Sequence, residues 1–493
     1  MTFTPPTSVL VLGSGVFGLS TAEALSRRPA FANTSITVVD RGSGGDQEDD
    51  SQHFPARDAA SIDSSRIIRA DYADPAYAAL ADEAQAFWRG TTKPADRAGD
   101  DDYIGGGRRY SESGLVVVAD KGPKTPGKKT GMDYVRESWT NVQALAARDP
   151  YLATKLQELP DAEAIRAVVG TGGTTGDWGY LNGASGWADA AASMAWVLRR
   201  VQASGRVTFV RGKVVALETD TSDSPSPRVT GVRLDDGRTL TADLTIAATG
   251  AWTESLLGGG LPDTTNPLAG SLAATGQVLG YVPLASDDEH AKVAGMPVVL
   301  NLTTGLFVIP PAKDSRELKV ARHAYGYVNP VLASESAAGA PSSPLTHLDD
   351  PQLVIPAEGA ADLRRGLRQM VPLPGLVDRP FAKTRICWYT DTPTGDFLVD
   401  YHPGLQGLFV ATGGSGHAFK FLPVIGEKVV DCVVGQRPEA FAEKWAWRTT
   451  AANAAASAGE GRPGWATVVT EDGSRGDRPG RLLREELNKE KAA

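Results

Sequence analysis

The chain has 493 residues, of which 41% are hydrophobic and 22% charged, as in an ordinary globular protein of two or three domains. The formal net charge is -9 and no long basic run occurs outside residues 121–131, so nucleic acid is not an expected partner. Two cysteines exclude a disulfide framework, and no Cys and His spacing is typical of a zinc site, so we expect no bound metal.

The first predicted element is a buried strand at residues 9–12 (VLVL), which leads into GSGVFG and a segment with helical spacing. A second apolar run, SITVVD, ends in Asp40, at the spacing of a dinucleotide-binding βαβ unit. In such a unit Gly13 makes the turn, Gly15 lets the backbone approach a pyrophosphate and Gly18 allows close helix packing. The acid then binds the ribose hydroxyls. The alternative is a glycine-rich turn that binds no nucleotide.

Two later strands also end in glycine-rich loops, TADLTIAATGAW at residues 241–252 and GLFVATGGSGHAFKF at residues 407–421. The first motif alone leaves NAD and FAD open. A nucleotide domain that the chain re-enters at these two places favours a discontinuous FAD-binding domain.

Between these landmarks, helical spacing predicts helices at residues 75–89 and 186–203. The sequence LDDGRT predicts a β-hairpin with its turn at Asp236 and Gly237. Residues 449–493 are rich in Ala and Gly and then in charge, so we expect a loosely ordered tail with RLLREEL as a candidate short helix.

Six blocks carry a resemblance to a known family: GSGVFGLSTAEAL, SSRIIRADYADPAY, ATGAWTESLL, ELKVARHAYG, CWYTDTPTGDFLVDYHP and GGSGHAFKFLPVIGEKVVD. They resemble the FAD-dependent amine oxidases that include monomeric sarcosine oxidase, pipecolate oxidase and fungal fructosyl amino acid oxidase (amadoriase). The resemblance implies an α/β fold (α+β overall), with a Rossmann-like FAD-binding domain and a substrate domain on a mainly antiparallel sheet. The expected ranges are 1–100, 163–265 and 385–448 for the first domain and 101–162 and 266–384 for the second.

The resemblance implies that Cys387 carries FAD through an 8α-S-cysteinyl thioether. That bond needs a thiolate, so nearby positive charge such as Arg385 or Lys383 would favour it. The alternative is a buried structural cysteine, the commoner fate of a lone thiol and our expectation for Cys432.

The resemblance also assigns roles to five basic residues. Arg69 and Lys420 hold the substrate carboxylate, and Arg66 lies beside the flavin ring. Lys319 corresponds to the oxygen-activating lysine, because fixed positive charge stabilises superoxide. His323, on the same face if this segment is extended, tunes or hydrogen-bonds the amine. The alternative for each of these basic residues is a cation that lies at the surface or contacts a phosphate. Further expected cofactor contacts are Arg41, Ser65, Arg66, Gly250, Gly414, Gly416, His417 and Lys420.

Two departures from the bacterial members change the expected pocket. Residues 62–65 replace a His-containing segment, and Gly414 stands where bacterial sarcosine oxidase has an aromatic residue. A larger or different amine is therefore expected.

The predicted function is an FAD-dependent oxidase of a secondary or N-substituted amino acid (sarcosine-, pipecolate- or saccharopine-like) that forms an imine and reduces O2 to H2O2. Alternatives are a deglycating fructosyl amino acid oxidase, a biosynthetic amine oxidase whose imine closes a ring and, more remotely, an NAD(P)H-dependent flavin monooxygenase. A catalytically silent FAD-binding protein is the last alternative.

The expected partners are a small amino acid and O2, with the protein as a monomer. A signal peptide pattern, a run of about 18 apolar residues and a C-terminal SKL-type signal are all absent from the sequence. We therefore expect a cytoplasmic protein that does not associate with a membrane.

Overall fold

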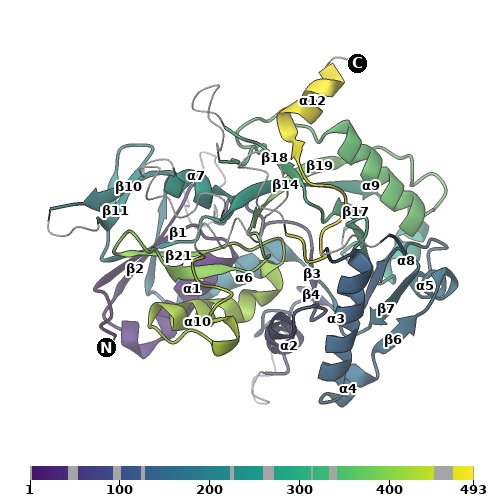
Figure 1. The fold of residues 1–493 in the computed structure, drawn as a ribbon, viewed down its shortest axis with the longest axis horizontal. Coiled ribbons are helices and arrows are strands. Elements are labelled where there is room, and N and C mark those ends of the chain that lie inside the picture. The colour runs from purple at the N-terminus through teal and green to yellow at the C-terminus, as the bar shows by residue number, and fades with distance from the viewer. Residues whose placement is uncertain are drawn as a thin grey trace.

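The computed structural model describes residues 3–42, 54–92, 101–123, 128–222, 227–258, 271–312, 315–331, 341–448 and 470–491. Two sheets dominate, one of six strands and one of ten. They occupy opposite ends of the long axis, with β1 and β2 on the left of Figure 1 and β6 and β7 on the right. We call the two parts the six-stranded half and the ten-stranded half.

The six-stranded half is a mostly parallel sheet in the order β20–β21–β13–β1–β2–β9. The strands are β1 (Ser8–Leu12), β2 (Ser35–Asp40), β9 (Val207–Arg211), β13 (Leu244–Ala247), β20 (Leu398–Tyr401) and β21 (Leu408–Thr412). β1 pairs in parallel with β2 on one side and β13 on the other, whereas β20 is antiparallel to β21. Because parallel strands end at the same edge, the loops after β1, β2 and β13 meet there.

Helices cover this sheet because burial of their apolar faces against it stabilises the fold. Helix α1 (Val16–Arg27) packs against α10 (Leu422–Val433) and α6 (Ala190–Ala203). The approach of α10 to α1 is so close that a Cβ on Gly426 would overlap the Ser20 carbonyl oxygen. Nine of the twelve α1 residues are buried, which fixes the glycine-rich turn before α1 against the sheet.

A three-stranded sheet beside this half consists of β10 (Val214–Asp220), β11 (Arg228–Leu234) and β12 (Thr239–Thr241). β11 and β12 are antiparallel, and Gly237 in their turn has φ +87. The hairpin predicted at Asp236 and Gly237 is therefore confirmed.

The ten-stranded half is a mainly antiparallel sheet in the order β22–β18–β14–β17–β16–β15–β5–β7–β6, and β19 also pairs with β14. Only the pairs β15–β5 and β18–β22 are parallel. The strands are β5 (Leu115–Ala119), β6 (Leu156–Leu159), β7 (Trp178–Asn182), β14 (Ala273–Pro283), β15 (Val298–Asn301), β16 (Leu306–Ile309), β17 (Glu317–Arg322), β18 (Tyr327–Val328), β19 (Lys383–Asp391) and β22 (Arg481–Leu482).

Helix α9 (Ala357–Met370) packs on β14, β16 and β17, and α3 (Gly131–Ala146) packs on β5 and β7. A small sheet made of β3 (Arg66–Ile68), β4 (Tyr110–Ser111) and β8 (Gly186–Ala188) completes the strands. The other helices are α2 (Pro75–Arg89), which confirms a prediction, α4 (Pro150–Ala153), α5 (Ala162–Val169), α7 (Thr253–Gly258), α8 (Asp287–Ala294) and α12 (Leu483–Lys491). Within the described ranges, no helix is long and apolar enough to cross a membrane.

Some predicted boundaries differ from the structure. β7 falls inside the range 163–265 and most of β19 inside 385–448, which we assigned to the FAD-binding domain, yet both strands belong to the ten-stranded sheet. Their hydrogen-bonding partners, β5 and β14, lie far away in sequence, and strand spacing does not reveal them. The helix predicted at 186–203 is also divided, because Asp189 caps a helix that starts at Ala190 and leaves β8 before it.

The prediction of a loosely ordered tail is wrong for residues 470–491. Residues 449–469 lie outside the described part of the chain. β22 pairs with β18, and α12, the yellow helix at the top of Figure 1, contacts α9. Thr470, Ser474 and Arg475 are buried. Ion pairs and backbone contacts hold residues 470–480 in place, which is why hydrophobic spacing gave no sign of their order, whereas α12 confirms the short helix predicted at RLLREEL.

Candidate active site

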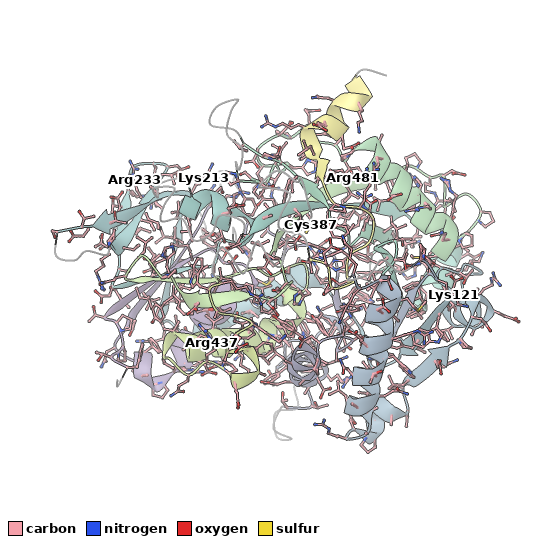
Figure 2. All side chains as sticks on the ribbon, in the orientation of Figure 1. Lys121, Lys213, Arg233, Cys387, Arg437 and Arg481 are labelled. Carbon is pink, nitrogen blue, oxygen red and sulfur yellow. The ribbon has the colours of Figure 1, made fainter. Side chains whose placement is uncertain are left out.

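A cavity of about 500 Å³ lies between the two halves and is lined by residues of both. One end is bordered by the loops that follow β1 and β2, and the other by side chains of β17 and β19. Cys387 lies near the middle of the molecule in Figure 2 and lines this cavity. Most of the predicted site residues therefore border one space.

The glycine-rich end of the cavity is shaped to hold a nucleotide. Gly13 has φ +94, and a Cβ there would lie 2.7 Å from the Ala248 carbonyl oxygen. A Cβ on Gly18 would overlap the Gly13 carbonyl oxygen. Gly15 is the N-cap of α1 and provides no side-chain cap, which leaves N–H groups of the first turn for a phosphate. Nearby, the buried Ser61 Oγ has no hydrogen-bond partner.

Asp40, the acid at the end of β2, lies beside the glycine-rich turn. Asp40 Oδ2 accepts hydrogen bonds from the Ser14 N–H (2.7 Å) and Oγ (2.6 Å), so it closes the glycine-rich turn. Arg41 forms an ion pair with Asp58, and its guanidinium lies 4.5 Å from the Trp252 ring centre. Both Asp40 and Arg41 line the cavity. Together with the orphaned Ser61 hydroxyl, this end of the cavity fits FAD.

The later glycine-rich loops reach the same cavity. Gly250, Gly414 and Gly416 all line it. Gly416 has φ +70, and a Cβ there would overlap the Tyr389 ring. Only glycine therefore allows this loop to approach β19.

Cys387 is buried on β19, and its closest charged neighbour is not the one expected. Arg66 Nη2 lies 3.4 Å from the Cys387 Sγ. Arg385 instead donates hydrogen bonds to the carbonyls of Ala59 and Ile62, and Lys383 is an exposed partner of Glu317. Arg66 is therefore the cation in contact with the thiol, in place of the expected Arg385 or Lys383. Cys432 is buried in the core, as predicted.

Lys319 forms an ion pair with an acid that the sequence analysis missed. Its Nζ lies 2.7 Å from Asp63 Oδ2 and donates to the Ser65 carbonyl oxygen at 2.7 Å. Burial lowers the pKa of Lys319 to about 8, against the attraction of Asp63. Despite its own burial, Asp63 has a pKa held well below its usual range by Lys319, Arg66 and Arg385.

Asp63 joins several site residues into one cluster. It also accepts hydrogen bonds from Arg66 and from the Tyr281 hydroxyl, so both of its oxygens are occupied. In the sequence, the acid between Ile62 and Ser64 is a signal that could have been noticed, since an isolated acid beside apolar residues usually has a buried partner.

His323 lies four residues beyond Lys319, just after the end of β17, and both line the cavity, as do Ala321 and Arg322. His323 Nδ1 lies 3.4 Å from the Tyr389 hydroxyl. Burial, reinforced by Arg475 and Arg69, lowers the pKa of His323 well below its usual value. The imidazole is therefore neutral.

Arg69 and Lys420 lie together at the far side of the cavity, and among the described residues neither has an ion-pair partner. Lys420 Nζ donates to the Tyr72 hydroxyl (2.8 Å) and to the His417 carbonyl (2.7 Å). The Arg69 guanidinium lies 5.0 Å from the Tyr72 ring centre and donates to the Asp71 carbonyl. Burial and the charge of Arg69 lower the pKa of Lys420 well below its usual value.

Such a pair of buried cations is costly unless an anion binds between them. His417 supports the pair: its Nδ1 is 2.9 Å from the Tyr72 hydroxyl and its Nε2 is 2.8 Å from the Gly395 carbonyl. Both imidazole nitrogens are thus engaged within the protein, and His417 also lines the cavity.

Comparison with known proteins gives consistent results. Residues 8–432 match the family described as "FAD dependent oxidoreductase". The chain is 34% identical to amino acid oxidase imqH of Aspergillus flavus, over 87% of this chain and 93% of that protein. It is 27% identical to L-saccharopine oxidase of Schizosaccharomyces pombe, over 90% of this chain and 93% of that protein.

The fold is similar to the crystal structure of the deglycating enzyme fructosamine oxidase (amadoriase II) from Aspergillus fumigatus. The TM-score is 0.71 at 26% sequence identity, and the alignment covers 97% of this chain and 96% of that chain. These matches confirm the resemblance predicted from the six sequence blocks.

Proposed function

The chain belongs to the FAD-dependent oxidoreductase family, and we propose that it oxidises a secondary or N-substituted amino acid at its carbon–nitrogen bond. One observation carries this proposal: Arg69 and Lys420 are buried cations without an ion pair in the described chain, and they border the cavity that Cys387 and Lys319 also line. When bound, FAD would accept one hydride, which carries both electrons, from the substrate and would pass those two electrons to O2.

Arg69 and Lys420 bind the substrate carboxylate. A guanidinium and an ammonium on the same side of a cavity fix both the position and the direction of a carboxylate. Because both groups are buried, water does not compete strongly for them, and the ion pairs formed with the substrate are stronger than at a surface.

The same two cations influence the amine. Positive charge near the amine disfavours its protonated form, and the neutral imidazole of His323 can accept a hydrogen bond from the amine N–H. Asp40 and Asp58 are the carboxylates among the lining residues, and both belong to the nucleotide end, so an ammonium finds no counter-ion near His323 within the described chain. The neutral amine, which is the reactive form, is favoured. The oxidised product is an imine, which water hydrolyses.

Lys319 provides positive charge for the reduction of O2, the step that follows oxidation of the amine. As O2 gains electrons it becomes an anion, and an ammonium fixed by Asp63 and the Ser65 carbonyl stabilises that charge. The product is H2O2.

Cys387 anchors FAD covalently in this proposal. Its position in the cavity wall and its contact with Arg66 support this assignment. The denatured protein should have the mass of the chain plus one FAD, Cys387→Ser should remove this addition, and Cys432→Ser should keep it. If wild-type protein that was fully loaded with flavin has the mass of the chain alone after denaturation, the covalent link is contradicted.

A second candidate, a deglycating oxidase of fructosyl amino acids, is supported by the similarity to amadoriase II. The two candidates are separated by anaerobic bleaching of the flavin with sarcosine, L-pipecolate, L-saccharopine, N-methyl aromatic amino acids and fructosyl-valine. We expect one N-substituted amino acid to reduce the flavin rapidly, with H2O2 after air is readmitted. If none bleaches the flavin while NADPH does, the amine oxidase proposal fails and a monooxygenase replaces it.

A further inference from the structure

The C-terminal segment that begins at Thr470 packs against segments that line the cavity. The Thr470 hydroxyl donates to the Thr392 carbonyl at 2.9 Å, and a Cβ on Gly473 would overlap the Thr130 carbonyl. Gly476 forms a β-bridge with Ala324. Residues 470–477, which we call the strap, therefore contact positions that lie far apart in sequence, at Thr130, Ala324 and Thr392.

Arg475 is the buried residue at the centre of the strap. Its guanidinium forms an ion pair with Asp391 (2.6 Å) and donates to the carbonyls of Ser415 (2.8 Å) and Ala324 (3.5 Å). It also lies 5.4 Å from the centre of the Tyr389 ring. The side chains of Arg475 and Asp391 are only 3% and 6% exposed, so this ion pair is shielded from solvent.

Each of these partners belongs to a segment that carries a residue of the proposed site. Asp391 ends β19, the strand of Cys387. Ser415 lies in the loop before His417, and its φ of +43 is unusual for a residue with a side chain. Ala324 directly follows His323. No secondary-structure element of the described chain contains all three segments, but one guanidinium contacts them all.

We propose that Arg475 is a positioning residue that fixes β19, the loop of Ser415 and the end of β17 relative to one another around the bound amine. This inference rests on the proposed amine oxidase function. It assigns a role to a part of the chain that lies beyond residue 448, the end of the range expected for the FAD-binding domain.

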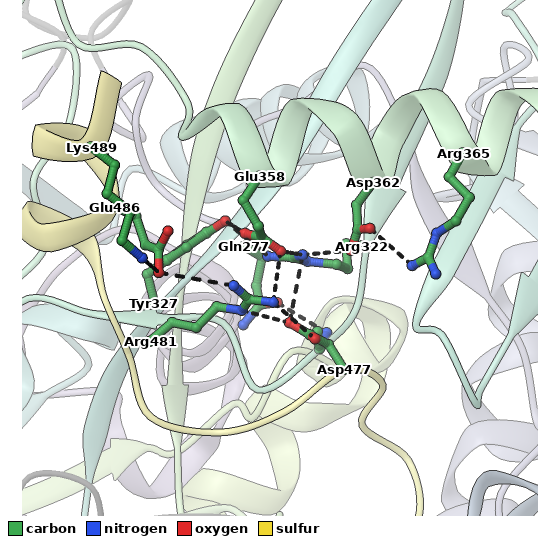
Figure 3. Close-up of polar contacts among 11 residues, drawn as sticks. Gln277, Arg322, Tyr327, Glu358, Asp362, Arg365, Asp477, Arg481, Glu486 and Lys489 are labelled. Carbon is green, nitrogen blue, oxygen red and sulfur yellow. Dashed lines mark hydrogen bonds and ion pairs between the residues drawn. The ribbon is translucent and has the colours of Figure 1, made fainter. Parts of the chain in front are cut away.

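A second cluster holds the strap in register (Figure 3). Arg322, next to His323 but on the opposite face of the chain, is 1% exposed and pairs with Glu358 (2.6 Å) and Asp362 (2.7 Å) on α9. Asp477, two residues after Arg475, lies 3.6 Å from Arg322 and 2.9 Å from Arg481. The strap is therefore tied to β17 on both sides of His323, which limits how far Arg475 can shift.

Arg475 also contributes charge. The titratable or charged groups around His323 are Tyr389 from β19, Arg69, His417, Lys420 and Arg475. After burial, Arg475 is the main cause of the lowered pKa of His323. Loss of this cation would raise the pKa values of both the imidazole and a bound amine, so the neutral forms would require higher pH.

The test compares Arg475→Gln and Arg475→Lys with Arg478→Gln, an exposed arginine three residues further along. We would measure anaerobic flavin reduction against substrate concentration and pH, perturbation of the flavin spectrum by benzoate, flavin content and Tm. For Arg475→Gln we expect the limiting rate to fall about tenfold or more. We also expect weaker benzoate binding and a rate profile shifted to higher pH. Arg475→Lys should recover part of the rate, and Arg478→Gln should match the wild type.

An Arg475→Gln protein with wild-type rates, benzoate affinity and pH profile would overturn the inference. If Arg475→Gln does not accumulate as folded protein, Arg475→Lys provides the test. A lysine keeps the positive charge but cannot reach all three partners of Arg475. Wild-type rates, benzoate affinity and pH profile in Arg475→Lys would again overturn the inference. Failure of the proposed function looks different, because no amine would then bleach the wild-type flavin. In that case the benzoate titration of the same variants still tests the positioning role.

Discussion

The two ends of the cavity are built in different ways. The nucleotide end is shaped by backbone, with Gly13, Gly15 and Gly18 within six consecutive residues and Asp40 one strand later. The amine end is shaped by side chains from segments far apart in sequence, such as Arg69, Lys420 and the strap. A site made from consecutive backbone leaves a sequence motif, whereas a site made from converging side chains leaves single residues that become significant only in the fold.

The largest effect should follow from breaking the backbone end. In Gly18→Ala the new methyl group would overlap the Gly13 carbonyl oxygen, and neither backbone can move away without disturbing the turn. We expect a cost of at least about 3 kcal/mol and protein that retains no FAD. Gly295→Ala is the control, because its φ is -93 and nothing lies within 4 Å of the added Cβ. Equal flavin content in the two variants would contradict the backbone account.

This contrast also explains which features the sequence could predict. The βαβ unit, the helix at 75–89 and the hairpin at Gly237 depend on local spacing, and all three were predicted correctly. Asp63 was missed because its partners Lys319 and Tyr281 are more than 200 residues away. Similarly, the strap is ordered by the distant partners of Arg475, which the sequence does not reveal. The composition of the tail alone therefore favoured a loosely ordered segment.

The amine end should be most sensitive to the loss of Lys319. Lys319→Met keeps the volume of the side chain but removes the positive charge beside Asp63. We expect the reaction of the reduced flavin with O2 to slow about 10²- to 10³-fold, while flavin reduction by substrate changes little. Stopped-flow mixing of the reduced enzyme with air-saturated buffer measures the first rate. Lys383→Met, an exposed lysine on β19, is the control. A normal O2 reaction in Lys319→Met would exclude this lysine from oxygen activation.

A smaller effect is expected from the carboxylate site. Lys420→Met removes one of two buried cations and leaves Arg69 and the cofactor end intact. A charged hydrogen bond of this kind contributes about 1.5–3 kcal/mol, so the substrate Kd should rise about 10- to 100-fold. Titration of the flavin spectrum with a simple carboxylate measures this directly. Lys428→Met, on the outer part of α10, should leave the affinity unchanged. Unchanged affinity in Lys420→Met would place the carboxylate elsewhere.

The smallest predicted effect concerns how Asp63 tunes Lys319. The pKa of Lys319 is about 8, so its ammonium is largely present below pH 8 and is lost as the pH rises through that value. The O2 reaction of the reduced enzyme should therefore be fast below about pH 8 and fall about tenfold per pH unit above it. Asp63 attracts the ammonium and raises the pKa of Lys319, so Asp63→Asn should move this fall to lower pH. Tyr281→Phe removes a hydrogen bond to Asp63 but keeps the carboxylate, and its profile should stay near that of the wild type. If Asp63→Asn and Tyr281→Phe shift the profile equally, the acid acts through the arrangement of its neighbours rather than through its charge, and the amine end would then depend on geometry as the nucleotide end does.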